Sequence, residues 1–349
     1  MAGKRTRVTA WSTPGFRQAG RAALLMVGVL TLLPALLLAG EPMIPSGAAE
    51  LVELEAALPI DRPVQTAAAK DKGRAVRLQK KDGAVEELTM ADYLWGVVAA
   101  EMPAAFEEEA LKAQACAART YTVIQQSASK HEGADICGDS ACCQAYVERE
   151  EARTRWGLNG AAYEEKVARA VAETDGLGIL YEGEPIQALF FSSAAGQTVD
   201  AVAVWGSAVD YLKSVDSPEG EEVPNYRTQV SLSAQDLKQT VLAAYPGADL
   251  TGKPEGWFGA IHRTEGGTVT SLTLGGITLT GGQVRALFAL RSACFTVDWD
   301  GETFTFDVTG YGHGVGMSQY GANAMAKEGK GFRDILTWYY TGTQVAALW

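Results

Sequence analysis

Residues 77–103 read RLQKKDGAVEELTMADYLWGVVAAEMP. The first half of this stretch predicts a β-hairpin, because Asp82-Gly83 is a strong two-residue turn signal. Thr89, followed three positions later by Asp92, resembles a helix capping box in which Asp replaces Glu. A helix is therefore expected from Asp92 onward. Pro103 should end it, because the residue before a proline disfavours helical backbone.

The rest of the chain continues this mixture of helices and antiparallel strands. Helices are expected at 107–126, 163–175, 233–244, 283–290, 321–327 and 332–340. Strands are expected within 179–191, 269–279 and 295–308, whereas 130–160 is interpreted as a loop. The helices and strands do not alternate as βαβ units, so α+β is the predicted fold class.

Charge is distributed unevenly along the 349 residues. The chain carries 30 Lys and Arg against 42 Asp and Glu, a net charge of −12 that argues against nucleic acid as a main partner. Residues 1–40, however, contain five cations and no acidic residue. The remainder is therefore more acidic than the whole chain, with 25 cations and 42 anions.

An apolar run from Ala22 to Ala39 follows these cations. Its eighteen residues would span about 27 Å as a helix, close to the roughly 30 Å of a bilayer core. We therefore predict a cytoplasmic basic tail at 1–21, a transmembrane anchor at 22–40, a tether at 41–73 and a folded domain outside the membrane at 74–349. A cleaved signal peptide is the alternative, but the run is long for one and its cleavage site is weak.

Glu101 is a lone carboxylate among small and apolar residues, at the end of the helix expected before Pro103. Burial of such a carboxyl group would raise its pKa, which suits a general acid near neutral pH. A solvated glutamate at a helix end is the alternative interpretation.

Lys112 and Arg119 lie seven residues apart in the helix expected at 107–126. They share one helix face, about 10.5 Å apart. Two cations over an alanine-lined face would be able to hold an extended anionic ligand. A solvated surface stripe is the alternative, and the pattern alone favours it.

Four glycines alternate with other residues from Gly310 to Gly316, ahead of the helix expected at 321–327. Such a loop lets the backbone approach a ligand closely and presents its N–H groups. His313 within the loop is a candidate hydrogen-bond donor or base. The alternative is a tight turn that contains a structural histidine.

His131, Cys137 and the adjacent Cys142 and Cys143 are close enough in the sequence to suggest a zinc site. Only three ligands are obvious, so a fourth, water or Asp139, would be needed. A disulfide is the alternative in an exported chain. The chain has five cysteines, an odd number that leaves at least one unpaired.

Several segments together resemble the stage II sporulation protein D family of spore-forming bacteria. They are 92–103, 111–121, 204–206, 211–215, 287–292, 310–321 and 338–342. The resemblance covers residues 75–345, and the motif around Glu101 and the glycine-rich loop are its most specific parts.

Members of that family are membrane-anchored lytic transglycosylases of peptidoglycan. The resemblance therefore implies cleavage of peptide-free glycan strands between N-acetylmuramic acid and N-acetylglucosamine, which leaves 1,6-anhydro ends, during engulfment in sporulation. It places the catalytic acid on Glu101 and basic substrate-binding positions on Lys112 and Arg119. The domain would enclose a glycan-binding groove between its helices and antiparallel strands.

The same resemblance implies further binding residues and a metal. Clostridial members bind zinc through one His and two Cys, which fall on His131, Cys137 and Cys143. We expect this zinc to be structural, because the reaction needs no activated water. The expected substrate-binding residues besides the cations are Ser192, Ser193, His313, Ser318, Gln319 and Tyr320. The family often has Ser-Gly-Gly where this chain has residues 194–196, Ala-Ala-Gly, so no side-chain role is expected at 194.

The implied partners are glycan strands and a cell-wall amidase of the engulfment machinery. The implied location is the mother-cell membrane, with the N-terminus cytoplasmic and the domain facing the intermembrane space. The alternative function is a non-catalytic glycan-binding protein that activates the amidase. The reaction products distinguish the two, because only an enzyme leaves anhydro-ended sugars.

Overall fold

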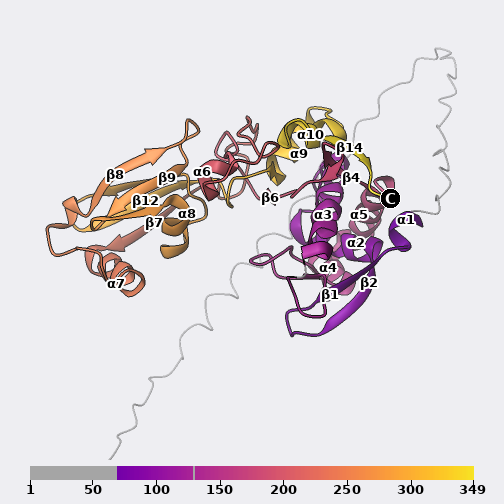
Figure 1. Cartoon of the computed structure of the whole chain (residues 1–349), viewed down its shortest axis with the longest axis horizontal. Coiled ribbons are helices and arrows are strands. Elements are labelled where there is room, and N and C mark those ends of the chain that lie inside the picture. Colours follow the sequence, from indigo (N-terminus) through magenta and orange to yellow (C-terminus); the bar gives the residue numbers. More distant parts are fainter. Residues whose placement is uncertain (1–68, 129) are drawn as a thin grey trace, which may run out of the picture. The chain divides into compact units, whose positions relative to one another are not determined.

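The computed structural model describes residues 69–128 and 130–349 (Figure 1). The predicted cytoplasmic tail, the predicted anchor and nearly all of the predicted tether lie outside the described residues. Within the described part of the chain, no helix has the length and apolar character that crossing a membrane requires. Helices and antiparallel strands are mixed there, as expected for an α+β fold.

The first part of the fold is mainly helical. Its helices are α1 (Ala69–Lys72), α2 (Met90–Glu101), α3 (Glu108–Ala128), α4 (Arg149–Trp156) and α5 (Gly160–Glu173). The strands of this part are β1 (Ala75–Gln79), β2 (Val85–Thr89), β3 (Ile136–Cys137), β4 (Leu177–Tyr181), β5 (Glu184–Pro185) and β6 (Phe190–Phe191). The last segments of the chain, β13 (Met317–Ser318), α9 (Gln319–Lys327), α10 (Phe332–Tyr339) and β14 (Gln344–Ala347), return to the same core.

Helix α3 is the centre of this core. It contacts α2, α5, α9, α10 and β4, and Figure 1 shows α2, α3 and α5 side by side. Alanines at 110, 113, 115, 117 and 118 are all fully buried. Because these side chains are small, neighbouring helices can approach α3 closely on several faces. The aromatic residues Tyr93, Trp95 and Tyr339 fill the remaining space.

The middle of the chain builds a second hydrophobic core. The helices of this middle segment are α6 (Ala201–Trp205), α7 (Ala234–Ala244) and α8 (Gly281–Leu287). Of these, α7 and α8 contribute residues to the second core, whereas α6 lies outside it. Strands β7 (Arg227–Ser233), β11 (Phe295–Trp299) and β12 (Thr303–Thr309) form one antiparallel sheet. Strands β8 (Phe258–Arg263), β9 (Val269–Leu274) and β10 (Ile277–Thr280) form another. Phe304 and Phe306 of β12 are buried between aromatic rings of both sheets.

The β-hairpin and the helix cap that were predicted at the start of the fold are confirmed. β1 and β2 pair antiparallel from Ala75 with Thr89 to Gln79 with Val85. The connection is longer than a two-residue turn, since residues 80–84 form it and Gly83 takes φ of +87°. The Thr89 hydroxyl then accepts the backbone N–H of Asp92 at 3.1 Å, which caps α2.

Two expectations about the middle segments need correction. Residues 130–160 are not only loop, because β3 and α4 lie within them. The expected second strand after the 182–184 turn is only β5, whereas β6 pairs in parallel with β13. That pairing joins residues more than 120 positions apart, so the local turn signal carried no information about it.

The described chain begins with a buried ion pair. Asp71 and Arg119 are both 0% exposed, and Arg119 Nη2 lies 2.6 Å from Asp71 Oδ2. The same guanidinium donates to the Leu177 carbonyl at 2.9 Å. Two findings follow. Arg119 points into the core and does not form the expected glycan-binding face, and the folded domain takes in residues 69–72, which were expected to end the tether.

Asp71→Ala should destabilise the domain strongly, because it leaves the Arg119 cation buried without a partner. Loss of one member of a buried pair lowers the free energy of unfolding by about 3–5 kcal/mol. Urea unfolding of the folded domain would measure this. Arg155→Ala is the matched control, since it breaks an exposed pair with Glu151 and should cost less than about 1 kcal/mol. Equal losses in both variants would contradict this assignment.

Candidate active site and metal cluster

Glu101 ends helix α2 with its side chain largely enclosed. Its Oε1 accepts the backbone N–H of Ala145 at 2.6 Å, and its Oε2 lies 3.4 Å from Gln319 Nε2. Among the described residues, no cation forms an ion pair with it. Burial raises the pKa of Glu101 above the usual glutamate range, and the two neutral donors offset only part of this effect. This is the electrostatic environment that a general acid needs near neutral pH.

Three residues from distant parts of the sequence meet at this carboxyl group. Gln319 is the first residue of α9, and its Nε2 also lies 3.4 Å from Oε1 of Gln114 on α3. Ala145 belongs to the loop after β3. The sequence predicted Gln319 as a site residue but missed Gln114 and Ala145. A backbone N–H has no side-chain signature, so sequence inspection had no signal for Ala145.

The predicted metal ligands converge. Ligand atoms of His131, Cys137, Cys142 and Cys143 all lie within 4.8 Å of one another. His131 Nε2 is 3.2 Å from Cys143 Sγ and 3.9 Å from Cys142 Sγ, and those two sulfurs are 4.0 Å apart. All five cysteines are free, so no disulfide joins them. The donor set is thus one imidazole and three thiols, and it could hold a metal ion.

The fourth ligand differs from the expected water or Asp139. Cys142 supplies it, so both adjacent cysteines face the cluster. Asp139 instead accepts the backbone N–H of Ala141 at 2.9 Å. This hydrogen bond closes the turn that precedes Cys142 and Cys143. Lys130 Nζ lies 3.9 Å from Cys143 Sγ, so a cation accompanies the thiol group.

The metal cluster and Glu101 share one short segment. Cys142 and Cys143 belong to the cluster, the next residue, Gln144, is buried, and Ala145 donates to Glu101. Gln144 Nε2 donates to the Tyr93 hydroxyl at 3.1 Å, which anchors the segment on α2. Whatever fixes the cysteines therefore also fixes the N–H group that Glu101 accepts.

The glycine-rich loop has a structural role rather than the expected ligand-cradling one. Gly310, Gly312, Gly314 and Gly316 all have positive φ, between +79° and +118°. A Cβ atom at Gly316 would lie 2.1 Å from the Leu189 carbonyl oxygen. The loop packs directly along residues 189–199, and Tyr311 and Ser193 exchange backbone hydrogen bonds of 2.8 and 3.0 Å. Glycine is needed here because no side chain fits and L-residues rarely adopt this backbone.

His313 is held by its own loop rather than presented to a ligand. Its Nδ1 accepts the Val315 N–H at 3.2 Å, so Nε2 carries the proton and donates to the Phe190 carbonyl at 3.1 Å. Burial, with the nearby Arg285 cation, lowers the pKa of His313 to about 4. The histidine is therefore neutral near pH 7 with both nitrogens occupied. The expected substrate-binding role is corrected to a structural one.

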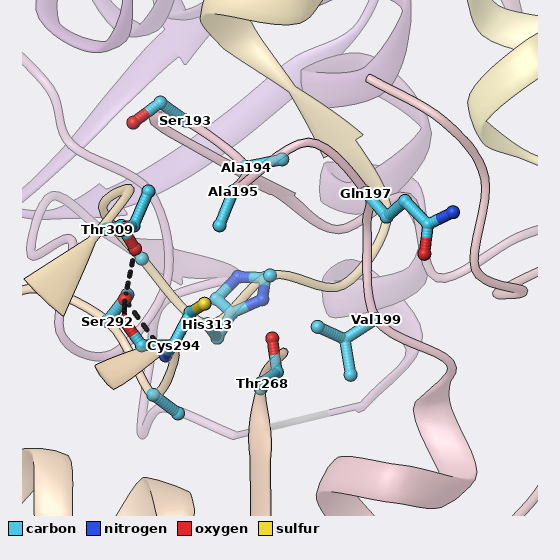
Figure 2. Close-up of a pocket in the computed structure, with 13 residues that line it drawn as sticks. Ser193, Ala194, Ala195, Gln197, Val199, Thr268, Ser292, Cys294, Thr309 and His313 are labelled. Carbon is cyan, nitrogen blue, oxygen red and sulfur yellow. Dashed lines mark hydrogen bonds between the residues drawn. The ribbon is translucent and has the colours of Figure 1, made fainter. Parts of the chain in front are cut away.

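Ser193 and His313 line a cavity that is too small for a sugar (Figure 2). Its volume is about 20 Å³, which is room for roughly one water molecule. The Ser193 hydroxyl is buried beside it without a protein partner. Ser193 thus does not offer a surface to glycan. Ser192 is half-buried, and its carbonyl accepts the Tyr320 N–H at 3.0 Å.

Ser318 is also corrected. It is fully buried, its hydroxyl caps α9 by accepting the Gly321 N–H at 3.2 Å, and it donates to the buried carboxylate of Glu219. Tyr320 remains partly accessible, since its ring is only half-buried. The ring packs edge-on against Phe106, with the centroids 4.9 Å apart.

Lys112 does not form the expected anionic-ligand clamp with Arg119. Its side chain is only 12% exposed, and its ammonium lies 2.7 Å from Glu109 and 2.6 Å from Glu173. Glu108 is 3.9 Å away. The local charge is therefore negative rather than positive, because helix α3 places two carboxylates one turn before Lys112 and α5 brings a third.

The sequence comparisons identify the family of this chain. Residues 79–181, which contain Glu101 and the metal cluster, match the family model described as "Stage II sporulation protein". Stage II sporulation protein D of Bacillus subtilis (strain 168) is 41% identical over 265 residues, which cover 75% of this chain and 76% of the relative. The chain belongs to the stage II sporulation protein D family.

Two further relatives show how widely the family extends. Stage II sporulation protein D of Bacillus amyloliquefaciens is 40% identical over 75% of both chains. The protein named "Amidase enhancer" of Bacillus subtilis is 27% identical over 312 residues, which cover 73% of this chain and 40% of that relative. Membership of the family connects this chain with sporulation, and the second relative's name connects the family with the cell wall.

Cys142→Ser should lower the bound metal from about one ion per chain, because it removes one of four ligands. It should also lower the melting temperature by roughly 5 °C or more, because the metal ties together a loop with little apolar surface. Elemental analysis and thermal unfolding would measure both effects. Cys294→Ser is the control, since Cys294 lies outside the cluster and should leave the metal content unchanged. A preparation without metal, before any substitution, would contradict the assignment.

Proposed function

We propose that this chain is a lytic transglycosylase of peptidoglycan. Its substrate would be peptide-free glycan, cleaved between N-acetylmuramic acid and N-acetylglucosamine to leave 1,6-anhydro ends. The observation that carries the proposal is the half-buried Glu101, held only by neutral donors and shifted by burial to a higher pKa. Its occurrence in a family of sporulation proteins supports the choice of a cell-wall substrate.

One carboxyl group suffices for this reaction. Protonated Glu101 would donate its proton to the oxygen that links the two sugars, and that bond breaks. The resulting carboxylate would take the proton of the muramic acid 6-hydroxyl as its oxygen attacks C1. Hydrolases that use water need a second carboxyl group, whereas here the nucleophile is part of the substrate. Proximity of the 6-hydroxyl then supplies much of the rate advantage.

The sugar is proposed to bind beside Tyr320 rather than over α3. Tyr320 follows Gln319, the residue that contacts Glu101, and its half-buried ring packs edge-on against Phe106. Aromatic rings offer apolar area with little conformational entropy to lose. A neutral acid does not repel the lactyl carboxylates of peptide-free glycan, which suits Glu101 with its raised pKa.

We propose zinc as the ion of the metal cluster and a structural role for it. One His and three Cys form a common structural zinc set, and tetrahedral Zn–S bonds of about 2.3 Å place sulfurs about 3.8 Å apart. The 4.0 Å between the Cys142 and Cys143 sulfurs is compatible with that spacing. Four protein ligands leave no open position for a reacting water. The zinc would order the segment that carries the Ala145 N–H.

The cellular setting follows the same proposal. Residues 22–40 would anchor the chain in the mother-cell membrane, and the domain would face the intermembrane space during engulfment. A cell-wall amidase is the proposed partner, because it would remove stem peptides and so produce the peptide-free substrate. Support comes from the apolar run after five cations and from the amidase-enhancer relative.

The second candidate is a non-catalytic glycan-binding protein that activates an amidase. The similarity to a protein named "Amidase enhancer" favours it. Both candidates predict glycan binding, so binding alone does not separate them. The chemical form of the product does, since intact strands after incubation would support the binder.

Glu101→Gln should abolish anhydro-ended products, because the amide keeps the shape of the side chain but transfers no proton. Glycan binding should change by less than about threefold, since the substituted group is nearly isosteric. Mass analysis of digests of peptide-free glycan would show this. Glu107→Gln is the matched control, because Glu107 is an exposed residue six positions further on, and this variant should retain full activity. Normal turnover by Glu101→Gln would remove the residue from the acid role.

The pH dependence should carry the signature of the raised pKa of Glu101. The first step needs the protonated carboxyl group, so kcat/KM falls as pH rises through that pKa. Because burial raises the pKa, this fall should occur above the range of an exposed glutamate. A pH–rate profile of the exported part would test it. A fall centred at or below the ordinary glutamate pKa would contradict the assignment of Glu101.

A further inference from the structure

The two oxygens of Glu101 have different partners, and the difference assigns them different roles. Oε1 accepts a backbone N–H from Ala145 at 2.6 Å, a short hydrogen bond from a donor that cannot rotate away. An oxygen held in this way remains an acceptor in both protonation states. The proton of the neutral acid therefore sits on Oε2, the oxygen near Gln319.

The Gln319 amide has a defined orientation because it contacts the Gln114 side chain. The amide of Gln319 lies 3.4 Å from Glu101 Oε2 and 3.4 Å from Gln114 Oε1. When Glu101 is ionised, both of these neighbours are acceptors, so the amide nitrogen of Gln319, and not its oxygen, faces them in that state. Gln319 is 6% exposed and Gln114 is 0% exposed, so water does not compete freely for either group.

Gln114 lowers the stability of the fold at its position. Its Nε2 is buried and has no hydrogen-bond partner among the described residues. The surrounding positions of α3 are occupied by small or apolar residues. A buried donor without a partner lowers stability, and an apolar residue of similar size would avoid that loss. Stability therefore does not explain the amide, whereas the orientation of Gln319 does.

The docking of α9 does not need the Gln319 side chain. The Ser318 hydroxyl already caps the helix by accepting the Gly321 N–H at 3.2 Å. Asn323 Oδ1 accepts the Glu107 N–H at 2.8 Å and so ties α9 to the start of α3. Gln319 is thus free for a role at the carboxyl group.

We propose that Gln319 and Gln114 are a positioning pair for Glu101. Gln114 orients the Gln319 amide, and this amide aims Oε2 and stabilises it when it is negatively charged. Oε2 gives its proton to the leaving glycosidic oxygen and later receives the proton of the 6-hydroxyl, so the acid is regenerated in each cycle. The roles in the reaction rest on the proposed transglycosylase function, whereas the effect on Glu101 itself does not.

The pair predicts a graded change in the pKa of Glu101. Gln319→Leu removes a donor to the carboxylate and should raise the pKa. Gln319→Glu places a second carboxyl group at the same point and should raise it further, because like charges disfavour ionisation. The pKa can be read by NMR titration of glutamate labelled at the carboxyl carbon, with Glu101→Gln used to assign the signal. This measurement needs no turnover, so it tests the pair even if no anhydro product forms.

Gln114→Leu separates positioning from stability. It removes a buried donor without a partner, so the melting temperature should stay the same or rise. The pKa of Glu101 should nevertheless change, and kcat on peptide-free glycan should fall about tenfold with KM nearly unchanged, because the acid is misaimed. A purely structural role of Gln114 would not explain a variant that is more stable but less active.

Asn323→Leu is the matched control on the same helix. It breaks a contact between α9 and α3 and should lower the melting temperature without changing the pKa of Glu101. The proposal is overturned if the Glu101 pKa is unchanged in both Gln319→Leu and Gln114→Leu, or if Asn323→Leu changes it equally. Absence of anhydro products from the wild-type chain, with the graded pKa series intact, would overturn the proposed reaction and keep the positioning pair.

Discussion

Helix α3 has to accept neighbours on nearly all of its sides, and this requirement decides much of the fold. Thirteen of its 21 residues are buried, and they contact α2, α5, α9, α10 and β4. Alanines make this possible, because each neighbouring backbone can come close without displacing a large side chain. The few polar residues that α3 buries are then held in fixed places. Arg119 meets Asp71, and Gln114 meets Gln319.

Two carboxyl groups in the same core have different kinds of partner. Asp71 is compensated by a full cation, which ties the first described residues to the centre of the domain. Glu101 receives only a backbone N–H and a side-chain amide, which do not offset the effect of burial on its pKa. Burial raises the pKa of both groups, but the Asp71 carboxyl group is held in an ion pair with Arg119, whereas Glu101 has no cation partner among the described residues and can exchange protons near neutral pH. The structure thereby separates a structural acid from a candidate catalytic one.

Two loops bring the remaining parts of the site to Glu101, and each is shaped by a different kind of constraint. The glycine-rich loop is fixed by close backbone packing against residues 189–199, and it delivers Gln319 and Tyr320 at its end. The loop after β3 carries the His and Cys cluster, which could hold a metal ion, and Gln144 anchors this loop on α2 by donating to the Tyr93 hydroxyl. Close packing therefore holds one side of the site, and a side-chain hydrogen bond next to the ligand cluster holds the other.

The sequence by itself determined what depends on neighbouring residues. The hairpin at 75–89, the Thr89 cap and the helices α2, α3, α7, α9 and α10 follow from turn signals, capping residues and apolar periodicity, all of which act within a few positions. Glu101 was found as a candidate acid because an isolated carboxylate among apolar residues is itself a local pattern. The short spacing of His131 and the cysteines likewise showed the ligand cluster, although the choice of the fourth ligand stayed open.

Only the tertiary structure decided which side chains compensate one another. Lys112 and Arg119 share a helix face in the sequence pattern, but distant carboxylates also pair with them: Glu173 joins the local Glu109 at Lys112, and Asp71 pairs with Arg119. His313 looked like a free base until both of its nitrogens were found bonded within its own region of the fold. The Ala145 N–H reaches Glu101, and Gln114 reaches Gln319, only through packing. Charge and hydrogen-bonding capacity are properties of pairs, and the partners here are distant in the chain, so the sequence could show the groups but not their partners.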